Sequence, residues 1–141
     1  MIDQMQLAAF RQSLPESQRN ETFRYFMVRW DIVKARYLIQ KRNTAPDVLL
    51  VAITAHTYGL YTPRDSDKAV YAVYIDEARA MSEAIATTIP VILALIQGDE
   101  GEEPKPLLID GLHRLYKAFQ EGKETIPCYA LTPQEERLCR I

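Results

Sequence analysis

Hydrophobic and polar residues follow two different periods along this chain. Short stretches that are apolar, β-branched or alternating predict strands over residues 23–29, 48–54, 70–75, 90–97, 106–109 and 126–131. Helical spacing predicts helices over residues 5–12, 32–42, 77–86 and 112–121, with a short last helix after Thr132. Strands and helices that interleave in this way indicate an α/β fold, with α+β as the alternative, and a mixed sheet.

Residues with strong terminal preferences bound several of these helices. Asp31 and Asp76 stand where an N-cap would precede residues 32–42 and 77–86. Asn43 is expected to end the first of these helices, and Gly122 to close the helix over residues 112–121 at its C′ position. Thr132-Pro-Gln-Glu135 has the pattern of a capping box with proline at the first helical position.

The length of the chain and its turn-forming segments indicate the domain organisation. A chain of 141 residues is expected to form one globular domain. We predict an N-terminal extension or short helix over residues 1–22 and a single domain over residues 23–141. Residues 58–68 are expected to form a loop, and residues 98–105 a charged turn across which the flanking strands pair antiparallel.

Charge and cysteine content exclude several classes of protein. Seventeen basic and nineteen acidic residues leave a net charge of −2, which argues against a protein that coats nucleic acid. Two cysteines, Cys128 and Cys139, cannot form a disulfide framework or a four-ligand zinc site. The apolar stretch over residues 89–96 is far shorter than the roughly twenty residues of a membrane span, and no secretory signal begins the chain. We expect a cytoplasmic protein with no membrane partner.

The segment with the side chains best suited to binding or catalysis is Asp110-Gly-Leu-His-Arg114, between a predicted strand and a predicted helix. Gly111 permits a tight turn, and the backbone N–H groups of the first helical turn lack intrahelical acceptors, so they can receive a phosphate. His113 and Arg114 are expected to point outward from the apolar face and add charged donors. Asp110 has the chemistry to cap the helix, hold a metal ion or accept a proton.

This segment and its surroundings resemble the ParB/sulfiredoxin fold family. The resemblance rests on Ile109-Asp-Gly-Leu-His-Arg114, on the strand that begins at Pro90, and on Ile126-Pro-Cys-Tyr-Ala-Leu131. It covers residues 90–131 and implies a pocket for a nucleotide such as ATP or CTP with Mg²⁺. In that reading Gly111, Leu112, His113 and Arg114 contact the ligand, Asp110 and His113 are catalytic, and Asp110 also holds the metal.

Departures from the family pattern argue against two of the family's known activities. Leu112 occupies the position at which sulfiredoxins carry their catalytic cysteine, so that chemistry is not expected. Only ten residues follow Leu131, too few for the helix-turn-helix domain of a partition protein. The motif Asp-Gly-x-His-Arg is most similar to that of the family's free-serine kinases. We identify no counterpart in this sequence of the catalytic glutamate that those kinases carry far from the motif.

Three functions remain open at this stage. The first is nucleotide or phosphate-ligand binding, extending to phosphoryl transfer or nucleotide hydrolysis. The second is a non-enzymatic DNA- or protein-binding module of a plasmid, phage or partition system, for which the only support is the basic excess of residues 1–46, eight basic against four acidic groups. The third is a Mg²⁺-dependent nuclease, which needs a second carboxylate beside Asp110.

Other polar residues have simpler interpretations. Capping explains Asp31, Asp76 and Glu77, and His56 follows a predicted buried strand. The basic residues Lys34, Lys41 and Arg42 share one side of the predicted helix over residues 32–42 and are expected to face solvent. Whether residues from the first half, such as Asp31, Lys34, His56 or Glu77, lie over the Asp110–Arg114 turn decides between catalysis and simple binding.

Overall fold

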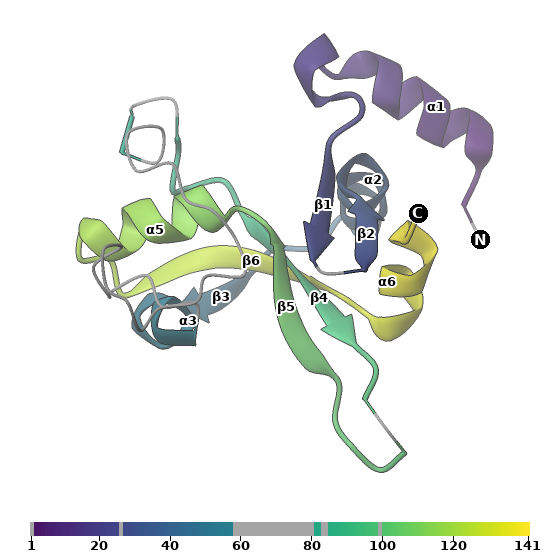
Figure 1. The fold of residues 1–141 in the computed structure, drawn as a ribbon. Coiled ribbons are helices and arrows are strands. Elements are labelled where there is room, and N and C mark those ends of the chain that lie inside the picture. Colours follow the sequence, from purple (N-terminus) through teal and green to yellow (C-terminus); the bar gives the residue numbers. More distant parts are fainter. Residues whose placement is uncertain (1, 26, 58–80, 83–84, 99) are drawn as a thin grey trace. The chain divides into compact units, whose positions relative to one another are not determined.

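The computed structural model describes residues 2–25, 27–57, 81–82, 85–98 and 100–141 (Figure 1). The chain forms two compact units, each assembled from segments that are distant in sequence. The first unit comprises Met1–Ala45, Leu93–Asp110 and Ala130–Ile141, and the second comprises Pro46–Ile92 and Gly111–Tyr129. Helices alternate with strands along the chain, and a four-stranded sheet has the order β3-β6-β4-β5, which confirms the predicted mixed α/β fold class.

The first unit begins with helix α1 (Gln4–Ser13), which confirms the helix predicted over residues 5–12. The Asp3 carboxylate caps this helix by accepting hydrogen bonds from the backbone N–H groups of Met5 and Gln6. A short 3₁₀ turn (Glu16–Gln18) follows, and α1 contacts helix α2 (Ile32–Arg42). The ring of Phe10 meets that of Tyr37 edge-on at 5.7 Å, so an aromatic pair joins the two helices.

The alternating run over residues 23–29 forms a hairpin and not one strand. Strand β1 (Thr22–Tyr25) pairs antiparallel with β2 (Val28–Asp31), and Tyr25 lies opposite Val28. The prediction of a single strand was wrong because the period-two alternation of the sequence continues from Tyr25 to Val28, with no glycine or asparagine between them to indicate a hairpin. Met27 continues the alternation of apolar residues in the sequence, but it lies in a turn and is 93% exposed.

Helix α2 has the predicted ends. The Asp31 carboxylate accepts a hydrogen bond from the backbone N–H of Lys34 at 3.1 Å, and Asn43 adopts the left-handed conformation of a C-cap with φ of 51°. Its buried face consists of Ile32, Val33, Ala35 and Tyr37. The last helix, α6 (Pro133–Cys139), begins with the predicted capping box and contacts both α2 and β2.

In the second unit, strand β3 (Asp47–Leu50) leads directly into helix α3 (Val51–Thr57). Residues 48–50 form a strand as predicted, but residues 51–54 of the predicted strand are helical. The predicted burial of the strand was wrong, since Val48 and Leu50 are exposed. The β-branched composition of this segment favours a strand locally. Tertiary packing decides otherwise, because Val51 and Ala55, spaced i and i+4, are buried on a helix that contacts α5 (Leu112–Gln120).

The strands around the segment of interest follow the prediction closely. Strand β4 spans Val91–Ile96, β5 spans Lys105–Asp110 and β6 spans Thr125–Leu131, while β4 and β5 are neighbours in the sheet. Strand β3 pairs antiparallel with β6. Helix α5 ends before Gly122, whose φ of 74° is that of the predicted C′ glycine.

Several predicted features fall outside the described residues. These are the loop over residues 58–68, the strand over residues 70–75, Asp76, Glu77 and the beginning of the helix over residues 77–86. At the end of that predicted helix, the described residues 81, 82, 85 and 86 are not helical. None of the helices in the described part of the chain is long and apolar enough to cross a membrane.

Candidate functional site

Gly111 makes the turn that begins helix α5. Its φ of +105° is a left-handed conformation that residues with a side chain rarely adopt. A Cβ atom at this position would lie 2.4 Å from Cγ1 and 2.8 Å from Cβ of Val91, far inside van der Waals contact. Position 111 therefore accepts glycine alone, for both conformational and steric reasons.

Because Gly111 is the N-cap of α5, the helix begins without a capping side chain. The first intrahelical bond runs from the backbone N–H of Leu115 to the Gly111 carbonyl at 2.9 Å. The N–H groups of the preceding helical turn have no partner within the helix and carry the positive end of its dipole. Leu112 and His113 in this turn are half-buried. Such a turn has the geometry to accept an anion.

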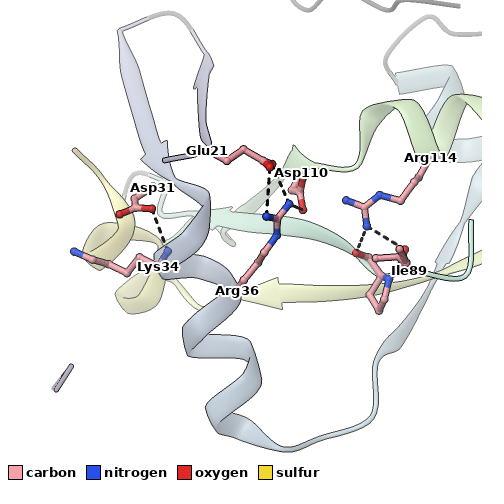
Figure 2. Close-up of polar contacts among 8 residues, drawn as sticks. Glu21, Asp31, Lys34, Arg36, Ile89, Asp110 and Arg114 are labelled. Atoms are coloured by element: carbon pink, nitrogen blue, oxygen red, sulfur yellow. Dashed lines mark hydrogen bonds and ion pairs between the residues drawn. The ribbon is translucent and has the colours of Figure 1, made fainter. Parts of the chain in front are cut away.

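Arg114 contacts the backbone of the segment that precedes β4. Its Nη1 donates hydrogen bonds to the carbonyl oxygens of Ile89 at 3.1 Å and Pro90 at 2.5 Å (Figure 2). Lys117, one turn further along α5, donates in the same way to the carbonyls of Ser82 and Ile85 at 2.9 and 2.8 Å. Arg114 was predicted to point outward, and it is instead half-buried and holds a neighbouring segment.

Asp110, the last residue of β5, belongs to a charged cluster of the first unit. Its Oδ2 accepts a hydrogen bond from Nη2 of Arg36 at 3.1 Å, and the same guanidinium donates to both carboxylate oxygens of Glu21 at 3.3 and 2.9 Å (Figure 2). The Asp110 side chain is only 11% exposed, against 36% for Glu21. The N-cap residue of α5 is Gly111 and not Asp110.

The charges of this cluster stabilise one another. Burial by itself lowers the pKa of the Arg36 guanidinium, but the carboxylates of Asp110 and Glu21 outweigh that effect and raise the pKa above its ordinary value. Arg36 is therefore a permanent cation between two anions. Sequence reasoning missed Arg36 and Glu21, because nothing in their local pattern indicates that a helix and a loop residue meet the end of a distant strand.

The donors around Asp110 do not fit a resident metal ion. A guanidinium lies between the two carboxylates of Glu21 and Asp110, so positive charge is already supplied there. The described residues contain no group of three or more His, Cys, Asp or Glu side chains arranged to bind a metal. Glu21 is the second carboxylate that the nuclease hypothesis lacked, but Arg36 binds both carboxylates and compensates one of their two negative charges.

Asp31 and Lys34 take part in other contacts of the first unit. Nη2 of Arg11 donates to Oδ2 of Asp31 at 2.7 Å, and the same carboxylate caps α2. Asp31 is therefore a structural carboxylate, as its position before the helix indicated. His56 lies in helix α3, and Glu77 lies outside the described residues.

The basic residues of α2 contact the protein. Nζ of Lys34 donates to the carbonyl of Leu138 at 3.3 Å, and Nζ of Lys41 donates to Oε1 of Gln6 at 3.0 Å. The guanidinium of Arg42 binds the Glu135 carboxylate and the Ala130 carbonyl. Lys41 is exposed as expected, whereas Lys34 and Arg42 are half-buried and Arg42 is paired with a carboxylate.

Comparison with known proteins adds no family. A scan against protein-family models, a search of curated proteins and a search of solved structures each find no match to this chain. The resemblance to the ParB/sulfiredoxin family, carried by residues 90–131, therefore stays a prediction.

Proposed function

We propose that this protein binds a nucleotide or another phosphate-bearing ligand at the first turn of helix α5. The observation that carries the proposal is the glycine at position 111, which has a left-handed conformation and no room for a Cβ atom beside Val91. Gly111 is the N-cap of helix α5, and the N–H groups of a first helical turn lack acceptors within the helix and suit phosphate oxygens.

His113 and Arg114 extend this turn with charged or polar donors. Nη1 of Arg114 donates to the carbonyls of Ile89 and Pro90, and the positive charge of a guanidinium is delocalised over the whole planar group. In the proposal Arg114 has two roles, since it anchors the residues before β4 and presents its positive charge to the phosphate. His113 contributes a further hydrogen bond or a proton.

In the proposal the ligand enters as its Mg²⁺ complex. Mg²⁺ commonly keeps several waters and takes its other ligands from substrate phosphates. ATP and CTP are the nucleotides to which the family resemblance points. Hydrolysis or transfer of a phosphoryl group is the corresponding activity. In the proposal Asp110, which precedes Gly111 in the chain, acts as the base that accepts a proton, and not as a metal ligand.

Calorimetric titration with ATP, CTP and ADP, each with Mg²⁺, tests the binding. Replacing Arg114 with alanine removes a charge-assisted contact, so we expect the dissociation constant to rise about 10- to 100-fold. Lys117→Ala is the matched control, because Lys117 makes the same kind of contact with backbone carbonyls one turn away. Equal affinities of both variants at equal thermal stability would leave Arg114 with a structural role only.

Negligible heats with every nucleotide for the wild-type protein would remove the proposal. A phosphate-release assay on the same samples tests the enzymatic extension. We expect Asp110→Asn to abolish any turnover while the Arg36–Glu21 contact remains. Unchanged turnover in Asp110→Asn would exclude Asp110 from the chemistry.

A further inference from the structure

An apolar pocket lies entirely within the first unit. None of the residues that line it belongs to the proposed phosphate site. Its volume is about 430 Å³. Small-molecule pockets usually measure about 300–1,000 Å³ and are lined mainly by apolar and aromatic groups, so this pocket has the size for one small ligand. The apolar walls are formed by Tyr25, Val28, Trp30, Ile96, Pro106 and Leu107.

The hairpin builds one wall of the pocket by alternation. Tyr25 lies opposite Val28 and Phe23 opposite Trp30, so these four side chains share one face of the β1–β2 ribbon. The rings of Phe23 and Trp30 stack at 6.2 Å with an interplanar angle of 26°. Strand β1 also contacts β5, which supplies Pro106 and Leu107 from the other side.

The indole of Trp30 is fixed in place by a buried polar contact. Its Nε1 donates to Oε2 of Glu136 at 3.2 Å, and Glu136 is only 1% exposed. The hydrogen-bonding capacity of this indole is therefore satisfied inside the unit, and the pocket is preformed against an anchored ring. A preformed pocket binds an apolar ligand without first ordering its own wall.

Two cations border these apolar walls, Lys105 and Arg140. The guanidinium of Arg140 is matched by the Glu136 carboxylate, to which both Nε and Nη2 donate. Lys105 is exposed at the start of β5, and no ion pair or hydrogen bond of its ammonium group is found within the described part of the chain. Of the two cations that line the pocket, Lys105 is therefore the one for which the described residues supply no ion-pair partner.

We infer that this pocket binds a small anionic amphiphile with a single apolar tail, such as a medium-chain fatty acid. The tail lies against Trp30, Val28 and Leu107, and the carboxylate meets the ammonium of Lys105. Met27, an adaptable apolar side chain in the hairpin turn that also borders the pocket, covers the tail. This inference is independent of the proposed phosphate site.

The single tryptophan of the chain provides the measurement, because Trp30 lines the pocket. Decanoate is titrated below its micellar concentration while the emission of Trp30 is recorded, alongside decanol and decyltrimethylammonium. We expect a saturable change with decanoate, weaker binding of decanol, and the weakest binding of the cationic amphiphile. No saturable change with decanoate, or equal affinity for the anionic and cationic amphiphiles, would overturn the inference.

Two variants, one at Lys105 and one at Leu107, measure separately how the carboxylate and the apolar tail of the amphiphile contribute to binding. Lys105→Ala is expected to weaken decanoate binding about two- to fivefold, as the loss of an exposed ion pair should, and to leave decanol binding unchanged. Lys123→Ala, a change of the same charge at an exposed position of the second unit, is its control and should have no effect. Equal decanoate affinity of the Lys105 and Lys123 variants would refute the role of Lys105.

Leu107→Phe fills the pocket and is expected to weaken decanoate and decanol binding alike by at least about tenfold, since it removes the volume that the tail occupies. Val48→Phe enlarges an exposed strand residue elsewhere and is the control. Sedimentation of the free protein tests the competing occupant, a second copy of the chain. A dimer that Leu107→Phe disrupts would assign the pocket to self-association and exclude the amphiphile.

Discussion

A Cβ atom on Gly111 would lie 2.4 Å from Cγ1 of Val91, so the first residue of strand β4 occupies the space that a side chain at position 111 would need. The turn into helix α5 thus depends on a residue that is twenty positions earlier in the chain. Any ligand at this turn approaches a backbone whose conformation is determined by packing.

Gly111→Ala is expected to destabilise the protein by about 2–4 kcal/mol, combining a left-handed conformation with overpacking. Gly122→Ala is the control, because Gly122 also has a positive φ but nothing lies within 4 Å of its Cβ position. That variant should lose only about 1 kcal/mol. Urea unfolding measures both, and equal losses would show that Val91 does not constrain position 111.

The contact of Asp110 with Arg36 should contribute more to stability than the contact of Glu21 with the same guanidinium. Asp110 is 11% exposed and Glu21 36%, so solvent screens the second pair more strongly. Double-mutant cycles with Arg36→Met, Asp110→Asn and Glu21→Gln should give coupling of roughly 1–2 kcal/mol for the first pair and less than about 1 kcal/mol for the second. A larger coupling with Glu21 would contradict this ranking.

Glu135 should make stability depend on pH in the acidic range. Burial raises the pKa of its carboxyl, but the hydrogen bond from the Thr132 N–H and the contact with Arg42 outweigh burial and lower the pKa below its ordinary value of 4.5. The stabilisation is therefore present above that ordinary pKa and is lost as pH falls through the lower pKa of the folded state.

Glu135→Gln keeps a capping residue and removes only the charge. It should cost about 1 kcal/mol at pH 7, with the difference from wild type shrinking below about pH 4.5 as the wild-type carboxyl is protonated. Urea unfolding between pH 3 and 7 measures this, with the exposed Glu124→Gln as control. A difference that persists unchanged at pH 3 would attribute the effect to shape and not to charge.

Both cysteines should be unreactive while the protein is folded. Burial raises the pKa of the Cys139 thiol to about 12, and burial together with Asp47 raises the pKa of Cys128. At neutral pH Cys139 then forms about a thousandfold less thiolate than a free cysteine. Ellman's reagent should modify neither thiol in buffer and both in urea. Rapid modification of one thiol in buffer would show that its side chain opens to solvent.

Local signals were sufficient where the stabilising partner is near in sequence. Asp31 and Asn43 bound helix α2 as predicted, and Thr132 and Glu135 form the predicted capping box. These contacts span three or four residues, so the residue types and their spacing contain all the information that is needed. The strand, glycine and helix order at Gly111 was predictable for the same reason.

Tertiary contacts decided the remaining features. Residues 51–57 form a helix despite their β-branched composition, because burial of Val51 and Ala55 outweighs a local preference. Arg114 turns toward the carbonyls of Ile89 and Pro90. Arg36, which also binds Glu21, contacts Asp110 across 74 residues of chain. The sequence by itself determined the elements whose ends are set by local contacts, among them helices α2 and α6 and the glycine turn before α5. Only the folded structure decided which charges are paired, because the partner of a long side chain depends on distant backbone brought near by packing.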